Sequence, residues 1–451
     1  MSTHDSAVGA ATLKRLRQRH GRSLRDTARA LIDTSAQLRQ PLDAGLSGVQ
    51  RSVARWESGT APVLPCERYQ FLLAHLYARD ADGHMALGPG TDFAELLDAL
   101  AHLGESEHRL NALRTHLART ATGSGRGLLA LLGPTAQDAL AVALADPSRV
   151  DEGLVDLLRV ALAHVNEQVG SIPFVRLQIC LAPVVESCRR LLDERASVPA
   201  AFLPDLQAVA AQAYTLAGRF AFETRDDQAA RSLYSAATTA AGATGASWRR
   251  AMVHLSHALV TLYSRPGLDA AKALVDAAVR DAAAGESVTV RARAHAVQAE
   301  VAARAGAGSE ARGALGLAWY DMDSDRDGDP AAVTTSFSPA HLRGFEGVTS
   351  LYVGDPSEAH AYFARSAASL SAPRERVQRA IVSTDQAVAR IRLDDPRAAA
   401  SLLHDCVEAA ASTGSRVASI RLRRARRDLR PWRREDFVTE LDDHMMDAFD
   451  V

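Results

Sequence analysis

The stretch SGVQRSVARWESGTAP, from Ser47 to Pro62, predicts a short helix whose beginning and end are both encoded. Ser47 is suited to cap the N-terminus, and Gln50 three residues later would complete a capping box. Gly59 and then Pro62 predict the end of the element, because glycine favours the residue after a helix and proline cannot continue one. The segment therefore predicts an independent helix between two turns.

This helix has two distinct faces. Val49, Val53 and Trp56 fall at positions i, i+4 and i+7, so they share one buried stripe. The opposite face carries Gln50, Arg51, Ala54 and Arg55. In the DNA major groove, Arg pairs with guanine and Gln with adenine. A small helix that buries three apolar groups and presents Gln and Arg outward suits that groove.

The segment SVARWESGTAP resembles the third helix and following turn of lambda-repressor/Cro-like (XRE-type) helix-turn-helix domains, which read Ser-x-x-Ile-Ser-x-Trp-Glu-x-Gly-x-x-x-Pro. Leu13 and Leu16 mark a first helix. GRSLRDTARAL, residues 21–31, resembles the second helix of the family, with Ser23 as its cap. CERYQFLLAHLYA, residues 66–78, supplies a closing helix. The resemblance covers about residues 11–80 and implies a DNA-binding domain.

Two features depart from the family pattern. The Gln that begins the second helix of the family, often a DNA contact, is Leu24 here. The connection to the third helix is also long, running from Asp33 to Leu46 where three or four residues are usual. We expect the second helix to extend to near Gln40 and to stop at Pro41, because proline cannot be accommodated in a helix interior.

Candidate DNA contacts follow from these positions. Gln50, Arg51 and Arg55 are the candidates for base edges, and Ser52 lies at the flank of the same face. The candidates for phosphate contacts near helix N-termini are Ser23, Arg25 and Ser47. Such heads act in pairs on two half-sites, so we expect duplex DNA as a partner and a homodimer as the assembly.

The first 80 residues are basic although the whole chain has a formal net charge of -2. They hold five more Lys and Arg than Asp and Glu, concentrated at Lys14, Arg15, Arg17, Arg19, Arg22, Arg25 and Arg29. A local basic patch is what phosphate contacts require. The alternative is a solvated basic face without a partner.

The remainder of the chain predicts an all-α fold. Aromatic residues make up 5%, alternating strand patterns are absent, and Ala, Leu and Arg dominate, which favours helix. We divide the chain into a helix-turn-helix domain, a Gly- and Pro-containing linker, a helical connecting region, an array of repeats, and a C-terminal capping helix with an acidic tail. The respective ranges are 1–80, 81–92, 93–205, 206–414 and 415–451.

The array is inferred from a recurring pattern, Ala-x-x-x-bulky-x-x-small. It falls at Ala230/Tyr234/Ala237, Ala270/Leu274/Ala277, Ala311/Leu315/Ala318, Ala359/Phe363/Ser366 and Ala399/Leu403/Cys406. Small residues of the preceding helices fall at Gly218, Ala258, Ala299, Gly347 and Ala387. The pattern resembles tetratricopeptide (TPR) repeats, which implies antiparallel helix pairs stacked in a solenoid. The spacing is 40 to 48 residues instead of 34, which predicts longer helices, and an irregular helical bundle is the alternative.

No pattern for catalysis or for a cofactor is present. The sequence contains no P-loop, G-x-S-x-G, H-E-x-x-H or Rossmann fingerprint. Asp323, Asp325, Asp327 and Gly328 match the first half of an EF-hand loop, but Thr334 stands where the last ligand should be Glu, so we expect an acidic surface loop. The four cysteines, without close pairing, are expected to be buried in a reducing cytoplasm. We expect that the protein is not an enzyme and that it binds no metal, cofactor or membrane.

Together these features favour a cytoplasmic bacterial transcriptional regulator. The combination resembles peptide-responsive regulators, which join the same two modules, and this implies a peptide or small-molecule effector on the concave face of the repeats. The candidate lining residues are Arg219, Phe222, Tyr263, Arg304 and Tyr352. The alternative is a TPR interaction scaffold whose head no longer binds DNA, which Leu24 and the long connection favour.

Overall fold

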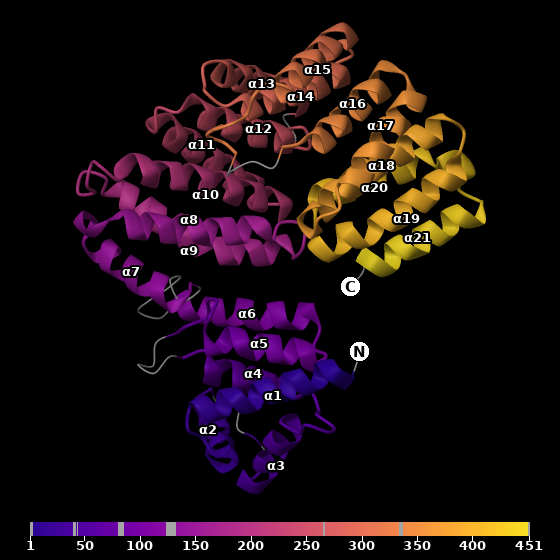
Figure 1. Cartoon of the computed structure of the whole chain (residues 1–451). Coiled ribbons are helices and arrows are strands. Elements are labelled where there is room, and N and C mark those ends of the chain that lie inside the picture. The colour runs from indigo at the N-terminus through magenta and orange to yellow at the C-terminus, as the bar shows by residue number, and fades with distance from the viewer. Residues whose placement is uncertain are drawn as a thin grey trace. The chain divides into compact units, whose positions relative to one another are not determined.

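The computed structural model describes residues 3–38, 42, 44–79, 85–122, 132–264, 267–332 and 337–449. Within these ranges the chain is all-α, with helices joined by short turns and no β-strand (Figure 1). It divides into two compact units. We call residues 1–158 with 193–199 the head unit, and residues 159–192 with 200–451 the repeat unit. No helix in the described ranges is both long and apolar enough to span a membrane.

The head unit contains the predicted helix-turn-helix elements and three further helices. Their bounds are α1 (Thr3–Arg19), α2 (Leu24–Gln37), α3 (Leu46–Trp56), α4 (Glu67–Tyr77), α5 (Asp92–Leu103), α6 (Glu107–Thr122) and α7 (Pro134–Ala145). Figure 1 shows α4, α5 and α6 stacked on one another, with α2 and α3 at one end of the unit. Leu13 and Leu16 are buried in the core, as predicted for the first helix.

One hydrophobic core joins α1 to α6, so the head extends beyond the predicted boundary at residue 80. Met85 and Leu87, which lie in the stretch predicted as a linker, are buried in this core. The backbones of α1 and α5 also approach closely: a Cβ on Gly9 would lie 2.6 Å from the carbonyl oxygen of Ala99. The Gly and Pro content of 81–92 predicted a linker, but its apolar residues tie it to the core.

The ends of α2 and α3 differ in part from the prediction. Ser23 caps α2 with a full capping box, as predicted. The N-cap of α3 is Gly45, however, and Ser47 lies in the first turn, so the predicted Ser47–Gln50 capping box is wrong. The helix begins earlier because Leu46 is partly buried against the head core. Helix α2 ends at Gln37, short of the predicted Gln40, and Pro41 lies outside the described residues.

The repeat unit is a stack of five antiparallel helix pairs preceded by α9 (Phe174–Asp193); α8 (Glu152–Glu167) crosses the boundary between the units. The pairs are α10 (Leu203–Glu223) with α11 (Asp227–Ala243), α12 (Ser247–Thr261) with α13 (Gly267–Ala283), α14 (Val288–Arg304) with α15 (Gly308–Met322), α16 (Pro339–Val353) with α17 (Pro356–Ser369), and α18 (Arg376–Arg392) with α19 (Pro396–Thr413). The predicted array of helix pairs is therefore confirmed (Figure 1).

Each pair turns on a residue in the left-handed region. These residues are Arg225, Gly267, Gly306, Gly354 and Asp394, with φ between 60° and 107°. In three turns the next residue is an Asp whose side chain caps the second helix. The sequence pattern is one residue out of register in α13, where Ala271, Val275 and Ala278 are the fully buried residues. Because alanine occupies both 270 and 271, and both 277 and 278, the pattern could not separate the two registers.

The small residue of the first helix lets the bulky residue of the second helix approach. A Cβ on Gly218 would lie 3.1 Å from the Tyr234 ring, and a Cβ on Gly347 would lie 2.6 Å from the Phe363 ring. Tyr234 and Phe363 are both fully buried.

We expect Gly347→Ala to lower the free energy of unfolding of the repeat unit by about 1–3 kcal/mol, because it overpacks the contact with Phe363. The matched control is Gly313→Ala in α15, where nothing lies within 4 Å of the added Cβ. That change is expected to stabilise by roughly 0.5–1 kcal/mol, since alanine favours helix over glycine. Urea unfolding followed by circular dichroism measures both, and equal effects of the two substitutions would contradict the packing argument.

The C-terminal helices close the array onto its own beginning. Helix α20 (Arg416–Asp428) contacts α10 as well as α18 and α19. Arg416 forms an ion pair with Asp227, and its backbone N–H donates to Glu223 Oε2 at 2.6 Å. The predicted acidic tail is instead helix α21 (Asp436–Phe449), which packs on α19. Buried Val438 and Leu441 supply the apolar stripe that orders it.

Candidate nucleic-acid interface and effector residues

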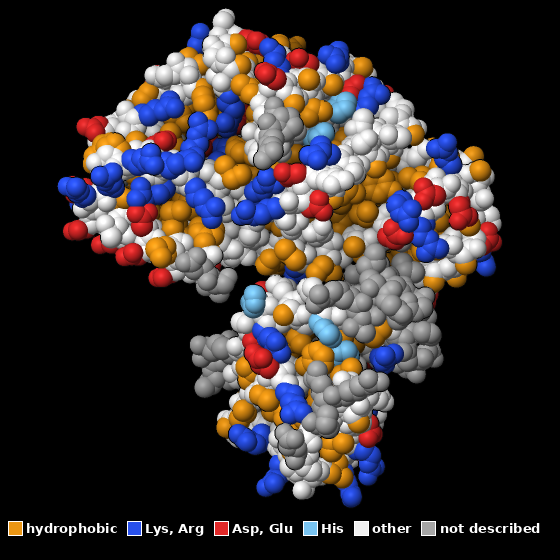
Figure 2. Space-filling view, turned by 180° about the vertical axis from the view of Figure 1, so that it is seen from behind, with side chains coloured by type: hydrophobic (Ala, Val, Ile, Leu, Met, Phe, Trp, Pro, Cys, Tyr) orange, Lys and Arg blue, Asp and Glu red, His pale blue; other side chains and the backbone are white. Residues whose placement is uncertain are grey.

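Helix α3 presents the two faces that its sequence predicts. Val49, Val53 and Trp56 are buried in the head core. Arg51 and Arg55 are exposed, whereas Gln50 is half-buried. Figure 2 shows Lys and Arg side chains projecting from the end of the head unit that α2 and α3 form. The face predicted to contact bases is thus open to solvent within its own unit.

Trp56 and Glu57 anchor the end of α3. The Trp56 ring meets the Tyr69 ring of α4 edge-on, with centroids 4.9 Å apart. Glu57 accepts hydrogen bonds from Arg17 Nε at 2.9 Å and Arg17 Nη2 at 2.8 Å, and both side chains are nearly buried. Arg17 also donates to the carbonyl oxygen of Arg22 at 2.8 Å. The hydrogen bonds that Arg17 donates to Glu57 raise the pKa of the Arg17 guanidinium. Arg17 is therefore structural, although the sequence grouped it with the basic patch.

Other arginines of α1 are neutralised by α5. Arg19 pairs with Asp92 at 2.7 Å and with Glu95 at 2.9 Å, and Arg15 lies 3.7 Å from Glu95. The exposed basic residues without an ion pair in the described ranges include Lys14 of α1 and four arginines of α2 and α3, and we call the four arginines together the arginine face. It consists of Arg25, Arg29, Arg51 and Arg55, which are exposed and form no ion pair with any residue of the described ranges.

The three candidate serines have different environments. The Ser23 hydroxyl accepts from the backbone N–H of Asp26 at 3.1 Å and donates to Asp26 Oδ2 at 2.6 Å. These hydrogen bonds lower the pKa of the Asp26 carboxyl, so a carboxylate already occupies the N-terminus of α2. Ser52 is half-buried and its hydroxyl donates to the carbonyl oxygen of Gly48 at 3.3 Å. Ser47 is exposed. The roles predicted for these serines at phosphates or bases stay predictions.

Three of the five predicted effector residues come together. Arg304 Nη1 donates to the Tyr352 hydroxyl at 2.9 Å, and Arg304 Nη2 donates to the Tyr263 hydroxyl at 3.3 Å. Arg421 of α20 and two carboxylates complete the group, which we call the polar cluster. Its members are Tyr263, Glu300, Arg304, Tyr352, Asp385 and Arg421. Sequence analysis missed Glu300, Asp385 and Arg421. Arg421 contacts its partners across 36 to 158 positions, whereas Glu300 also pairs with Arg304, four positions away.

The polar cluster is paired internally rather than open to a ligand. Glu300 accepts from Arg304 Nη2 at 2.7 Å, and Arg421 forms an ion pair with Asp385. Arg421 Nε also donates to the Tyr263 hydroxyl at 2.5 Å. Burial raises the pKa of the Tyr263 hydroxyl and of the Asp385 carboxyl. Four helices, α14, α16, α18 and α20, and the turn that follows α12 contribute side chains, so the cluster joins the array internally.

The two remaining effector candidates lie elsewhere. Phe222 is fully buried, with the Arg416 guanidinium 4.3 Å from its ring centroid. Arg219 lines a cavity between the first helix pairs. The five candidates therefore fall in three places and do not form a single site.

In the described part of the chain, no group of three or more metal-ligating side chains occurs. Asp323, Asp325 and Asp327 are exposed, as predicted for an acidic surface loop. Cys188 and Cys406 are buried as predicted, but Cys180 is only partly buried and Cys66 is exposed. Cys66 is the N-cap of α4, a position that lies outside the helix and faces solvent.

His75 makes the head unit sensitive to acid. Its ring packs against Phe71 at 4.6 Å and His116 at 5.4 Å, and its Nε2 is buried without a hydrogen-bond partner. Burial, followed by the charge of His116, lowers the pKa of His75 from 6.5 to about 4. Between these values the unfolded chain binds the proton and the folded head does not, so stability falls as pH falls through this window.

We expect hydrogen exchange of the α4 amides, corrected for intrinsic rates, to show reduced protection as the pH is lowered from about 6.5 to about 4. His75→Phe removes the titrating group and keeps a ring, so its loss of protection over the same window should be smaller. An identical pH dependence in the two proteins would rule out His75 as the cause.

Comparison with known proteins gives no relative: no family model, no curated protein and no solved structure matches the chain.

Proposed function

We propose that this protein is a sequence-specific DNA-binding transcriptional regulator, in which the head unit binds duplex DNA and the repeat unit serves dimerisation and effector binding. The observation that carries the proposal is the arginine face. Its four guanidinium groups are exposed and lack ion-pair partners among the described residues, while the opposite face of α3 is buried. Unpaired positive charge beside a short exposed helix is the footprint of a protein that binds nucleic acid.

The four arginines divide by position. Arg51 and Arg55 lie one turn apart on α3 beside Gln50, where they can meet base edges in the major groove. Arg25 and Arg29 lie one turn apart on α2, where they can meet the phosphate backbone. The N-cap of α3 is Gly45, which has no side chain to accept a hydrogen bond from the first backbone N–H groups of the helix. A phosphate can take that place. The resemblance to XRE-type domains supports the same arrangement.

A homodimer follows from the mode of binding. Helix-turn-helix heads bind two half-sites about one helical turn apart, so one head reads only half of an operator. We propose that the repeat unit holds two heads together.

The experiment begins with the full chain and fragmented genomic DNA. We expect the bound duplexes to share a sequence with two half-sites, and the affinity for that sequence to fall steeply as salt rises, because counterions are released from phosphates. The mass of the free protein in solution should be that of two chains. Failure of the folded protein to retain any duplex at about 50 mM salt would overturn the proposal.

The second candidate function is a protein-interaction scaffold. Leu24 favours it, because this position carries a DNA-contacting Gln in the resembling family and is here a leucine partly buried against the head core. A scaffold would leave duplex DNA unbound at every salt concentration although the head is folded.

A further inference from the structure

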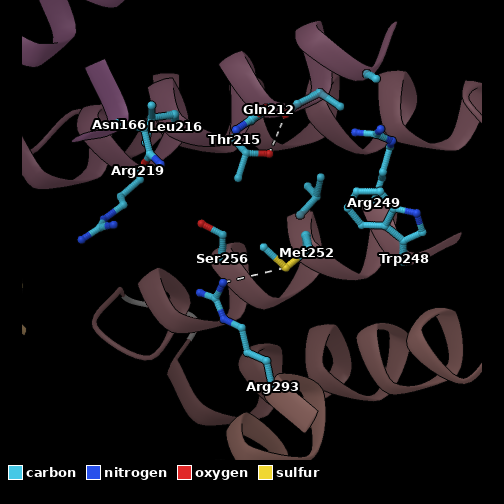
Figure 3. A pocket seen from close by; sticks show the side chains of 13 residues that line it. Asn166, Gln212, Thr215, Leu216, Arg219, Trp248, Arg249, Met252, Ser256 and Arg293 are labelled. Carbon is cyan, nitrogen blue, oxygen red and sulfur yellow. Dashed lines mark hydrogen bonds between the residues drawn. The ribbon is translucent and has the colours of Figure 1, made fainter. Parts of the chain in front are cut away.

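The repeat unit contains a cavity of about 160 Å³ between its first helices. Figure 3 shows the side chains that line it, from α8, α10, α12 and α14. The residues that decide its chemistry are Arg219 of α10, Trp248, Arg249 and Met252 of α12, and Arg293 of α14. Cavities of about 150 Å³ admit a molecule of the size of benzene, so this cavity accommodates a small organic ligand.

Three arginines line this cavity and no carboxylate does. Arg293 forms a weak hydrogen bond, from its Nη1 to the Met252 sulfur at 3.8 Å. Arg249 lies over the Trp248 ring at 4.4 Å, and Arg219 lies 5.9 Å from the Phe174 ring centroid. Within the described ranges none of the three forms an ion pair.

Two carboxylates whose charges interact with these arginines, Asp205 and Glu223, are held by other groups. Asp205, whose charge acts on Arg249, is 2.5 Å from Arg159. Glu223, one turn beyond Arg219, accepts from the backbone N–H of Arg416 and from the Ser415 hydroxyl. Burial, and then the charge of Arg219, lowers the pKa of Arg293 to about 10, as expected for a guanidinium without a counter-charge.

The polar cluster provides the contrast within the same unit. There each buried arginine has a carboxylate, Arg304 with Glu300 and Arg421 with Asp385. A buried charge without a partner is costly, and an anion that enters the site removes that cost. The arginines that line the cavity would therefore be stabilised by a bound anion.

The rest of the lining defines the other part of the ligand. Trp248 and Met252 offer an aromatic face and a polarisable thioether. Asn166 and Gln212 contribute side-chain amides, which can donate or accept hydrogen bonds (Figure 3). Apolar walls with a few converging polar groups are typical of small-molecule sites.

We propose that this cavity binds a small organic anion, a carboxylate or a phosphate ester, whose charge lies between Arg219 and Arg293, with the apolar part of the ligand against Met252 and toward Trp248. The proposal that the cavity binds an anion depends only on the cavity and the residues that line it. Its use as an effector site rests on the proposed function. Arg219, which lines the cavity, is one of the residues that the sequence selected for that role.

The test uses the full chain without DNA, so that its outcome does not depend on the proposed function. Thermal unfolding and calorimetry are recorded with benzoate, phenyl phosphate, inorganic phosphate and neutral benzamide, each at up to about 10 mM. We expect benzoate or phenyl phosphate to raise the melting temperature and to release heat on binding. Inorganic phosphate should act more weakly and benzamide not at all. Whichever of benzoate and phenyl phosphate binds more tightly shows whether the site prefers a carboxylate or a phosphate ester.

Variants locate the site. Arg293→Met should weaken binding of the preferred anion by about tenfold or more while leaving the free protein as stable as before or more stable, because it removes an unpaired buried charge. Arg219→Met is the second variant, and Arg280→Met, an exposed arginine of α13 outside the cavity, is the matched control. Absence of any shift with both aromatic anions, equal binding of benzamide, or unchanged binding in both cavity variants would overturn the proposal.

Discussion

Replacing Arg51 and Arg55 together by alanine is expected to lower the affinity of the full chain for its operator by roughly 30-fold to 10,000-fold, since each arginine contact to a base contributes about 1–3 kcal/mol. Both side chains are exposed and neither is in an ion pair within the described residues, so the folded head loses no internal contact that involves a carboxylate. The effect therefore falls on binding and not on folding.

Two measurements separate base recognition from general attraction. A gel-shift titration with the operator and with unrelated duplex should show that the double variant loses most of the preference for the operator. The same titration at several salt concentrations reports phosphate contacts, whose loss reduces the salt slope by about one each. Arg25→Ala with Arg29→Ala should flatten the salt slope and leave the preference in place.

The matched control is Arg149→Ala with Arg195→Ala. These two arginines are exposed, belong to the head unit and lie outside α2 and α3, so the charge change is the same and the position differs. We expect only a small decrease in affinity. If the control and the Arg51/Arg55 variant were equally weakened, α3 would not be the recognition helix.

Replacing Arg421 by alanine is expected to lower the free energy of unfolding of the repeat unit by about 3–5 kcal/mol, because it leaves the buried Asp385 carboxyl without its counter-charge. The Arg421 side chain is 11% exposed and that of Asp385 is 16% exposed, so water compensates little. The hydrogen bond from Arg421 to the Tyr263 hydroxyl is lost in the same change.

The double variant Arg421→Met with Asp385→Leu should be less destabilised than Arg421→Ala, because it removes both charges of the pair and keeps apolar volume. Arg424→Ala, an exposed residue of the same helix, should change stability by less than about 0.5 kcal/mol. Urea unfolding measures these three variants and the two single changes Arg421→Met and Asp385→Leu. A double variant as unstable as the sum of its two single changes would show that the charges do not interact.

Much of the fold could be predicted because helical periodicity and small-to-bulky contacts are local. The second helices were located at Ala230, Ala311, Ala359 and Ala399, and the glycine of two first helices does lie against a buried ring. The register of α13 could not be predicted, since adjacent alanines satisfy the pattern equally well. The closing contact of α20 with α10 joins residues about 190 positions apart, which no repeat pattern specifies.

The candidate site, too, could be predicted only where it depends on residues close together in the sequence. The exposed face of α3 follows from its own sequence, because apolar spacing alone decides which side of a short helix is buried. Which basic residues stay unpaired depends on helix packing. Arg17 is occupied by Glu57, 40 positions away, and Arg19 by Asp92, 73 positions away.

The sequence by itself determined the helices, the pairing of neighbours in the array and the polar edge of α3, because each depends on residues within one or two turns or on the next helix. Only the tertiary structure decided which arginines are neutralised, which form the polar cluster and which line a cavity without a counter-charge. The physical reason is that an ion pair forms wherever packing brings a carboxylate within about 4 Å, irrespective of the separation of the two residues along the chain.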